Sequence, residues 1–495
     1  WLLSSDALTI LRYSAMAPQF QDDEGTIPIP EPVLKRPRKA RPVAPGAFGL
    51  DFRSGCLCCG SVWCSDSTKS TPASGSTWQS CRAEVLRLRQ RLVADRRHFH
   101  QNPELSFEEY ETSKYCAQRL RDLGLTVADG IAPGTGVVAV LKGGGGEGPC
   151  VALRADMDAL PIHEEAADGE EPLPFASTKP GVMHACGHDA HMATMLCVAE
   201  VLSVESFRRR LRGSVKFIFQ PAEESSNEEH PQGGAFEMVH KAHVLDGVDA
   251  IYGMHVWSFA PVGVVGVTPG CIMAACDTLE IDVEGFGGHG AAPQGTVDAV
   301  LVMGHLITSL HSIVSRNQNP QSSTVLTIGS ASAGEAPNVV AAKAKLRGTV
   351  RCLDSESQAV MKRRVEEVCN GIGATFNAKI ALKYREEAPN VVNDAEATQH
   401  VKKAAASIVS PEGLQQITTM ASEDFAFFLE ASKSFPAVTV PGIKGCFFFV
   451  GAAPKAETAG NRPHHNPTFT VDEDSMIVGA SIFVQLVENL LGGPP

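Results

Sequence analysis

The sequence has no uninterrupted run of apolar residues that approaches about 18, the length that a membrane-spanning helix requires, so no membrane span is expected. It also has no excess of basic charge. Its 43 Lys and Arg residues against 56 Asp and Glu residues give a net charge of −13, which argues against a general nucleic-acid-binding protein because contacts to phosphates need a basic surface. With 495 residues and 43% hydrophobic composition, the chain is typical of a folded globular protein of about three domains.

Residues 1–80 differ in composition from the rest of the chain. Pro-rich, basic and Ser/Thr/Gly-rich stretches alternate there with little periodicity, which predicts a low-complexity or disordered tail. Residues 1–10 are too polar and too short for a secretory signal, and a basic run at 35–41 is interpreted as a solvated linker rather than a targeting signal.

The cysteines divide into a cluster in the tail and single residues scattered through the rest of the chain. The cluster is followed only by Cys81, so a zinc site is not expected there; it consists of Cys56, Cys58, Cys59 and Cys64. The scattered single cysteines indicate a reducing compartment. A cytoplasmic or organellar location is therefore favoured over secretion.

Helical and strand patterns alternate from residue 81 to residue 272. Val85, Leu88 and Leu92 share one helical face, and β-rich runs at 137–141, 151–153, 215–220 and 250–255 surround a helix predicted at 190–204. This alternation predicts an α/β domain with a mainly parallel central sheet flanked by helices. The glycine-rich segment 143–146 lacks the Gly-Lys-Ser/Thr signature of a phosphate loop, so we expect it to close a hairpin between two strands.

The pattern changes between residues 273 and 387. Strands at 278–283, 324–328 and 345–350 alternate apolar and polar residues, and helices are predicted at 298–315 and 357–372. Half-buried strands of this kind indicate a small α+β domain with one solvent-facing sheet surface. The α/β pattern resumes over 388–495, so we predict that 273–387 is an inserted domain and that 81–272 and 388–495 form one domain in two pieces.

Three of the predicted α/β strands lead directly into side chains that bind metal ions. Asp156 and Asp158 follow the run at 151–154, Glu223 and Glu224 follow the strand at 215–220, and His255 ends the run at 251–254. Because ligands gather at the carboxyl ends of strands in open α/β sheets, these groups can converge although they are distant in sequence. Each alone is more often a solvated strand terminus.

The segment 183–191 is denser in such residues. Cys186 and His188 are two residues apart, so they reach one ion only from a turn, and thiolate and imidazole suit the same divalent ions. Asp189 is expected to cap a helix that begins at Ala190. His184 and His188, at i,i+4 spacing, are an alternative ligand pair if the helix begins earlier.

Two further histidine-bearing segments are weak signals by themselves. His464 and His465 precede Asn-Pro467, where a surface histidine pair is often without function. His289 lies among glycines that leave an imidazole accessible, although a flexible loop histidine would look the same.

Seven motifs occur in an order that resembles the M20 metallopeptidase clan, and above all its amidohydrolase branch of N-acyl-amino-acid amidohydrolases, hippurate hydrolases and plant auxin-conjugate hydrolases. The resemblance extends over about 83–491 and rests on the segments 97–109 together with 154–161, 184–191, 220–224, 287–293, 422–425 and 465–467.

The resemblance implies a site for two divalent ions. Cys186 would be the ligand that both ions share, in place of the aspartate of other clan members. Glu224 and His465 would complete the shell of one ion, and His188 and His255 that of the other. The resemblance therefore favours His188 over His184 and His465 over His464 as ion ligands. Manganese or zinc is expected, with cobalt as a third candidate.

The remaining roles also follow from the resemblance. Glu223 matches the general base, while Asp156 and Asp158 match a segment that would orient the ligands, because the metal histidine of that segment is missing here. In the clan, further positions on the inserted domain approach the carbonyl and carboxylate of the substrate, often from the partner subunit of a homodimer; they correspond to His289, Asn338 and Arg351.

The expected activity is metal-dependent hydrolysis of N-acyl-amino acids to a carboxylic acid and a free amino acid, with a Glu223 general base and no nucleic-acid partner. A dipeptidase or an N-acetyl-amino-acid deacetylase of the same clan is the alternative. A catalytically silent binding protein on the same fold is a remote one, because the expected ligands, the base and the lid histidine are all present in the sequence.

Overall fold

The computed structural model describes residues 77–454 and 462–493, apart from the side chains of 77–80, 431 and 434. These residues belong to one compact unit, Thr71–Pro495. Almost all of the predicted tail lies outside the described residues, together with its basic run and its cysteine cluster.

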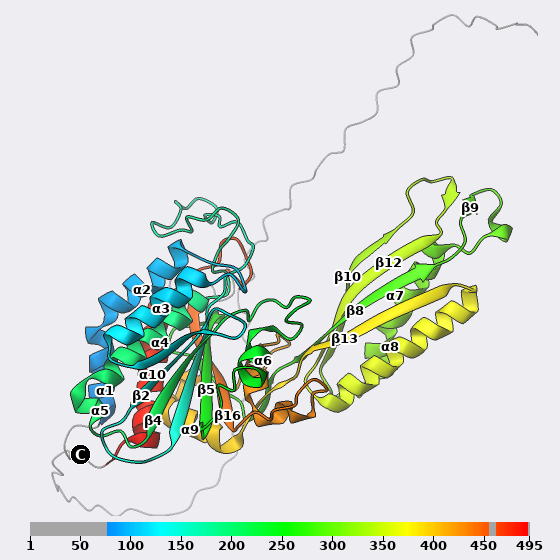
Figure 1. Ribbon diagram of the computed structural model, residues 1–495. Helices are drawn as coiled ribbons and strands as arrows, with labels where there is room; N and C mark the ends of the chain where they lie inside the picture. Colours follow the sequence, from blue (N-terminus) through cyan, green and yellow to red (C-terminus); the bar gives the residue numbers. More distant parts are fainter. Residues whose placement is uncertain (1–76, 455–461, 494–495) are drawn as a thin grey trace, which may run out of the picture. The chain divides into compact units, whose positions relative to one another are not determined.

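An eight-stranded sheet forms the centre of the first domain, with the strand order β1-β2-β4-β3-β5-β16-β6-β15 (Figure 1). The strands are β1 Thr126–Ile131, β2 Gly136–Lys142, β3 Cys150–Asp156, β4 Ser214–Gln220, β5 Ala250–Pro261, β6 Val265–Gly266, β15 Leu414–Gln415 and β16 Gly445–Ala453. The central strands β4, β3, β5 and β16 are parallel, whereas β1 and β2 add an antiparallel edge. All residues of β16 are buried, as expected for a parallel strand covered on both faces.

The glycine-rich segment 143–146 does not close a hairpin, so that prediction was wrong. β4 lies between β2 and β3 and pairs with both. The segment instead packs on the chain that leads into β4, where the amides of Gly143 and Gly145 donate to the carbonyls of Gly213 and Leu211. It is a crossover connection between two strands that are not neighbours in the sheet.

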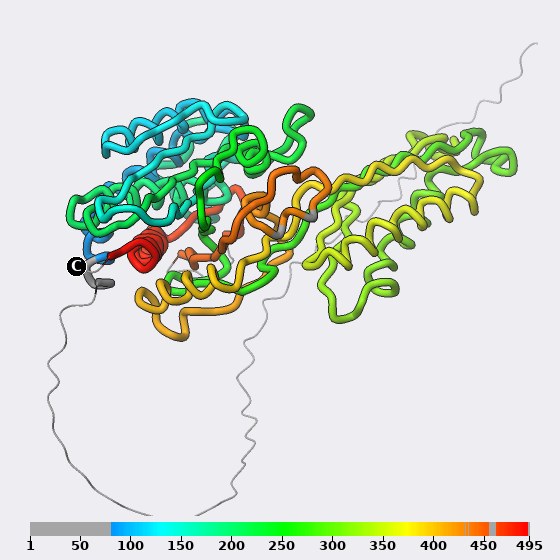
Figure 2. The backbone as a smooth tube through the Cα atoms, turned by 60° about the horizontal axis from the view of Figure 1, so that its bottom comes forward, coloured from blue at the N-terminus to red at the C-terminus, as the bar shows by residue number. Residues whose placement is uncertain are grey.

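Helices cover both faces of this sheet because alternate residues of its strands supply two separate cores. Leu153 and Phe217 belong to the larger core, under α2 (Arg89–Gln101), α4 (His188–Ser203) and α10 (Asp474–Leu491). Figure 2 shows the chain-terminal helix α10 near the N-terminal helices, and α1 (Thr77–Arg87) packs against it. The same face carries α3 Tyr110–Asp122, α5 Glu205–Arg208 and α9 Ala395–Ala405.

The opposite face of the sheet packs against α6 (Gly233–His240) and the short helix η3 (Asp424–Phe428). Ala152 and Ile218 contribute to this second core from β3 and β4. The two cores together hold the carboxyl ends of the central strands in fixed positions, which is where the sequence places its metal-binding side chains.

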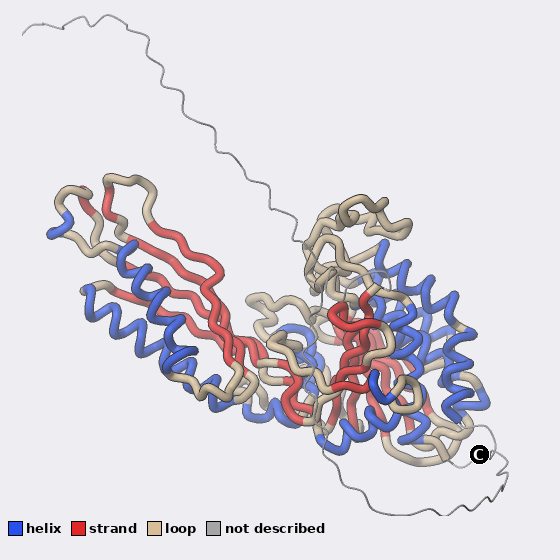
Figure 3. Tube along the Cα trace, turned by 180° about the vertical axis from the view of Figure 1, so that it is seen from behind, coloured by secondary structure: helices blue, strands red, loops and turns tan. Residues whose placement is uncertain are grey.

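The second domain is an antiparallel sheet of order β10-β12-β8-β13 with two helices on one face (Figure 3). Its elements are β8 Ala275–Glu284, α7 Ala299–Arg316, β10 Thr324–Ala333, β12 Lys343–Cys352, α8 Ser355–Phe376 and β13 Lys379–Ala388. The chain enters and leaves this sheet beside the short pair β7 (Gly270–Met273) and β14 (Val391–Asn393). The predicted α/β fold with an inserted α+β domain is confirmed, while β13 was missed and the residue boundaries remain predictions.

Two helices in the described part of the chain are long and apolar enough to cross a membrane by length and composition alone, α7 and α10. In α10, 78% of the residues are buried, so its apolar surface fills the core of the first domain. In α7 only 28% are buried, but Val302, Leu306 and Leu310 form a stripe that packs on the inserted sheet, as in an amphipathic helix. Neither helix is strong evidence for a membrane span.

Candidate metal centre

The ends of β3 and β4 and the middle of β5 bring together the side chains that the sequence singled out. Asp156 at the end of β3 pairs in register with Gln220 at the end of β4. His188 Nε2 lies 3.7 Å from an Asp156 oxygen, 3.9 Å from Glu223 and 3.8 Å from Glu224. The expected convergence at the carboxyl edge of the sheet is present.

Cys186 belongs to two groups of three potential ligands. One group joins it to His188 and His255, and the other joins it to Glu224 and His465. Within each group the ligand atoms lie within 4.8 Å of one another. The groups share only the Cys186 sulfur, so the geometry fits two ions with a common thiolate ligand.

A left-handed glycine places Cys186 and His188 on the same side. Gly187 has φ +97° and α4 begins immediately after it, at His188. The helix therefore begins two residues earlier than predicted, and Asp189 does not cap it. Asp189 is buried and accepts hydrogen bonds from Arg96 and His100 instead.

Both buried histidines of the first group direct the same nitrogen toward the cluster. His188 Nδ1 donates to the backbone carbonyl of Asp158 at 2.9 Å, and His255 Nδ1 donates to that of Val256 at 2.6 Å. Each Nε2 is thereby left with its lone pair free for an ion. His188 Nε2 is buried and has no hydrogen-bond partner in the described part of the chain, as expected of a metal ligand.

The structure distinguishes the adjacent histidines 464 and 465. His464 is half-buried and uses both nitrogens: Nδ1 donates to the Cys186 carbonyl at 3.1 Å, and Nε2 accepts from the Ser258 amide at 3.2 Å. Burial lowers the pKa of His464 to about 3. His465, in a left-handed conformation with φ +61°, extends toward Glu224, and its Nε2 lies 3.1 Å from Oε1. His465 is therefore the one positioned to bind an ion.

His184 is not part of either group. It precedes α4, so it does not form a helical i,i+4 pair with His188. It is buried, neither of its ring nitrogens has a hydrogen-bond partner among the described residues, and burial lowers its pKa to about 3.

The electrostatics of the cluster require positive charge. Burial, together with the carboxylates of Glu224 and Glu223, raises the pKa of the Cys186 thiol well above its usual value. Although burial opposes protonation of His188, the carboxylates of Asp156 and Asp158 raise its pKa to about 10. Divalent cations supply the charge that stabilises a thiolate here, so the residues present fit two metal ions.

Glu223 is the group best suited to accept a proton. Burial, followed by the charges of Glu423, Glu224 and Asp424, raises its pKa well above the usual value. A general base with a raised pKa binds a proton more firmly.

One arginine organises the carboxylates behind this site, and sequence reasoning missed its role. Arg154 is fully buried and donates to Gln220 at 2.7 Å, to Asp156 at 2.7 Å, to Glu423 at 2.8 Å and to Asp424 at 3.0 Å. The segments 154–161 and 422–425 both appear among the motifs, but nothing in the sequence pairs them. Asp156 accepts from His191 Nδ1 at 2.6 Å, and Asp158 accepts from the Glu224 amide at 2.9 Å; the orienting role of both carboxylates stays a prediction.

The inserted domain separates its three predicted substrate-binding residues into two places. His289 on β9 (Gly288–His289) pairs with Val339 on β11 (Val339–Val340), directly beside Asn338 and ahead of the start of β12. Arg351 lies eight positions further along β12, which is about 26 Å at the rise of a strand, and donates to Ser422 Oγ at 2.6 Å. Ser422 adjoins Glu423, which is grouped with Glu223. His289 and Asn338 are thus together, and Arg351 is apart from them.

The hydrogen bonding of His289 makes its outer nitrogen a donor. Its Nδ1 accepts from the Ala291 amide at 3.0 Å, so the neutral ring carries its proton on Nε2. The side chain is exposed, and Nε2 is therefore available to a carbonyl oxygen.

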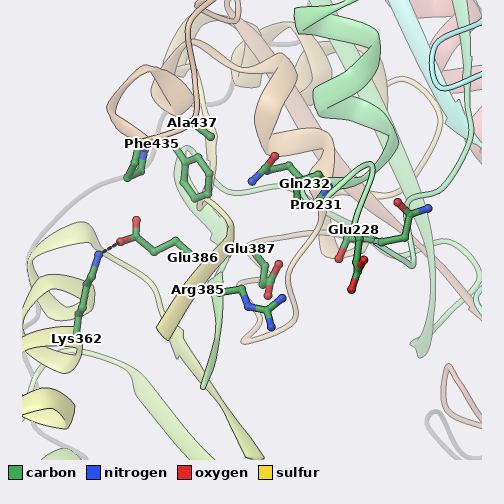
Figure 4. A pocket seen from close by; sticks show the side chains of 12 residues that line it. Glu228, Pro231, Gln232, Lys362, Arg385, Glu386, Glu387, Phe435 and Ala437 are labelled. Atoms are coloured by element: carbon green, nitrogen blue, oxygen red, sulfur yellow. Dashed lines mark hydrogen bonds and ion pairs between the residues drawn. The ribbon is translucent and has the colours of Figure 1, made fainter. Parts of the chain in front are cut away.

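A cavity of ≈ 640 Å³ lies apart from the metal groups (Figure 4). It is lined by residues of the loop 226–232, by Lys362 and Arg385–Glu387, and by 435–437. Figure 4 shows the ion pair between Lys362 and Glu386 at its edge. No member of the metal groups lines it, so we place the reaction at the Cys186 cluster and not in this cavity.

Comparison with known proteins agrees with this geometry. The sequence profile of Peptidase family M20/M25/M40 matches residues 152–489. The chain belongs to this M20 family. Within the family it is 37% identical to the hippurate hydrolase of Campylobacter jejuni, an alignment that covers 71% of this chain and 88% of the relative. It is also 37% identical to an N-acetyl-L-cysteine deacetylase of Bacillus subtilis, covering 82% and 89%.

A solved structure of an M20 protein supports the fold and the metal content. The YXEP protein of Bacillus subtilis, described as a dinuclear metal binding peptidase, has a TM-score of 0.65 and 34% identity, covering 82% of this chain and 99% of that one. Together with the two ligand groups, this supports two metal ions in the present M20 chain, which is a metal-dependent amidohydrolase of the family.

The Gly187 position gives a direct test of the metal centre. A Cβ at Gly187 would lie 2.4 Å from Val256 Cγ2, whereas one at Gly181, with φ +78°, would meet nothing within 4 Å. Both Gly187→Ala and Gly181→Ala place an L-residue in a left-handed conformation, at a cost of about 1–2 kcal/mol. Only Gly187→Ala should also displace Cys186 and His188, and we expect it to lower the metal content per subunit, measured by elemental analysis. Equal metal content in the two variants would contradict this placement of the ligands.

Proposed function

We propose that the protein hydrolyses the linear amide bond of N-acyl-amino acids, with an aromatic or aliphatic acyl group, to a carboxylic acid and a free amino acid. The observation that carries the proposal is the pair of ligand groups sharing Cys186, with Glu223 beside them. Cys186, His188 and His255 would hold one ion. Glu224 and His465, again with Cys186, would hold the other.

Manganese or zinc fits this mixed donor set best, with cobalt as a third candidate. Two such ions, when bound, supply Lewis acidity that polarises the amide carbonyl and lowers the pKa of water. The protein supplies the remaining groups, in fixed positions around the bond that is cleaved.

Glu223 would carry the proton through the reaction. Its carboxylate takes a proton from the attacking water and returns it to the nitrogen of the leaving amine. Asp156 and Asp158 would only orient: the first fixes His191, and the second fixes the backbone of Glu224.

Arg351 would bind the free carboxylate of the amino-acid half. Its Nη1 is engaged with Ser422, beside the segment that carries Glu423. The rest of the guanidinium provides further donors in a planar arrangement that suits a carboxylate. Arg351 would thus act in the site of its own subunit.

His289 and Asn338 would act on a different subunit. The separation of about 26 Å along β12 is too long for one small substrate to contact both Arg351 and His289. We therefore propose a homodimer in which the inserted domain of each subunit brings His289 Nε2 to the carbonyl oxygen in the partner's site. The exposed side chains of Val300, Leu301 and Val325, on α7 and the edge strand β10, support an interface on this domain.

A narrower alternative has its own support. The likeness to an N-acetyl-L-cysteine deacetylase favours a small acetyl group as the acyl half. A dipeptidase of the same clan would use the same groups on a peptide bond. These alternatives differ in substrate and not in the residues that act.

The first prediction concerns the base. Glu223→Ala should lower kcat by about 10²–10⁴-fold, because proton transfer is lost, while the ions stay bound. Cys186→Ala should instead release metal, because it removes the ligand common to both groups. Metal content by elemental analysis and kcat on an N-acyl amino acid check both. A fully active Glu223→Ala variant, or metal-free wild-type protein, would refute the mechanism.

The second prediction concerns the substrate. In a panel of N-benzoyl-, N-indoleacetyl- and N-acetyl-amino acids and free dipeptides, we expect the highest kcat/KM for N-acyl-amino acids with an aromatic or aliphatic acyl group. The carboxamides of the same N-acyl-amino acids serve as neutral controls, since they lack the carboxylate that Arg351 is expected to bind. A preference for dipeptides or for acetyl groups alone would select the corresponding alternative.

The third prediction concerns the homodimer. His289→Ala alone should lower kcat by about 10²–10³-fold, the usual effect of losing one oxyanion donor. Mixing denatured and refolded His289→Ala and Glu223→Ala chains should restore about one quarter of wild-type activity, because half of the dimers are mixed and each has one intact site. Refolded single variants are the controls. Absence of any recovery would show that His289 does not act across the dimer.

A further inference from the structure

Glu109 is a buried carboxylate that belongs to neither ligand group. It directly precedes α3 and has no exposed surface. Its Oε1 accepts a hydrogen bond from the Ala222 amide at 2.8 Å, and its Oε2 accepts one from Thr135 Oγ1 at 2.7 Å. It therefore reaches the chain one residue ahead of Glu223.

Ala222 has an unusual backbone conformation. Its φ of +49° places it in the left-handed region, which an L-residue other than Asn or Asp seldom occupies without support from its surroundings. Ala222 is fully buried, so its amide would have no solvent to bind if Glu109 were absent. The hydrogen bond to Glu109 supplies that support.

A second carboxylate holds the other side of Glu223. The Glu224 amide donates to Asp158 Oδ2 at 2.9 Å. The amides on either side of Glu223 thus end on two different carboxylates, Glu109 and Asp158. With both ends held, the direction of the Glu223 side chain is determined by the backbone.

We propose that Glu109 is a positioning residue that holds Ala222 in the left-handed conformation and so directs Glu223 toward the bond that is cleaved. This inference rests on the proposed function of Glu223 as the base. Without the contact, Ala222 relaxes toward negative φ, and the Glu223 carboxylate turns away from the reacting water while the ion ligands remain. A misplacement of about 1 Å costs about 100-fold in rate.

Two conservative variants separate reach from charge. Glu109→Asp keeps the carboxylate but shortens the side chain by one carbon–carbon bond, about 1.5 Å, so it no longer reaches the Ala222 amide. Glu109→Gln keeps the length and an acceptor oxygen but removes the charge. Burial, followed by the charge of Asp158, raises the pKa of Glu109 to about 7, so a neutral amide is a close substitute. Thr135→Val is the matched control, because it removes the other hydrogen bond of Glu109 and leaves the Ala222 contact.

The experiment measures kcat, KM and metal content for the wild type and these three variants on an N-acyl amino acid. Glu109→Asp should lose about 100-fold in kcat with KM and metal content close to wild type, while Glu109→Gln and Thr135→Val retain wild-type kcat. An active Glu109→Asp variant, or a Glu109→Gln variant as impaired as Glu109→Asp, overturns the proposal. A loss of metal in Glu109→Asp would also overturn it, since the role would then be structural.

Hydrogen exchange of the peptide 219–226 separates this proposal from the proposed function. Glu109→Asp should increase exchange there, and Glu109→Gln should not, whether or not the protein cleaves a given substrate. If the wild type cleaves nothing in the panel, the proposed function fails, and unchanged exchange in Glu109→Asp would independently refute the contact with Ala222.

Discussion

The concentration of negative charge at the carboxyl ends of β3 and β4, beside His255 of β5, is the constraint on which the rest of the structure depends. Asp156, Glu223 and Glu224 meet there with a buried thiol, and like charges in a buried place are costly unless they are compensated. Two kinds of cation compensate this negative charge. Arg154 neutralises the side toward Asp156, Glu423 and Asp424. The two ligand groups on the Cys186 side are suited to metal ions.

This division explains why the cluster is built on a parallel sheet. Parallel strands end at one edge, so groups from distant parts of the sequence arrive together. The helices on both faces bury the carboxyl halves of β3 and β4, and charges at this buried edge remain strong because little water screens them. The same rigidity positions Glu223, since the end of β4 ahead of it and the amides of Ala222 and Glu224 on either side of it are held.

Much of the fold was predictable because strand and helix periods depend on residue type and local spacing, whereas the expected roles of the site residues came from the resemblance to the M20 clan. The strand and helix periods predicted the α/β sheet and the inserted domain, and the pairing of a cysteine with a histidine in 183–191 predicted a metal segment. The failures share one cause, which is contact between distant residues. The hairpin prediction at 143–146 fails because β4, some seventy residues later in the sequence, enters between β2 and β3. The prediction of Asp189 as a helix cap fails because its carboxylate binds Arg96 and His100, which are distant in sequence.

The sequence did not predict the separation of Arg351 from His289, because this separation depends on where each residue lies along its strand and not on their distance in sequence.

The backbone conformation of single residues also determines how the site is arranged. Three residues of the site have positive φ: Gly187, Ala222 and His465. Gly187 lies between two expected ion ligands, Ala222 directly precedes the expected base, and His465 is itself an expected ligand. A left-handed residue turns the chain sharply, and Ala222 does so directly ahead of Glu223 and Glu224, whose carboxylates both lie near His188 Nε2. Such residues are strained unless the surroundings hold them, and at Ala222 the holding group is a buried carboxylate from a helix start more than one hundred residues away. The precision of the site therefore depends on contacts outside it as much as on the ligands themselves.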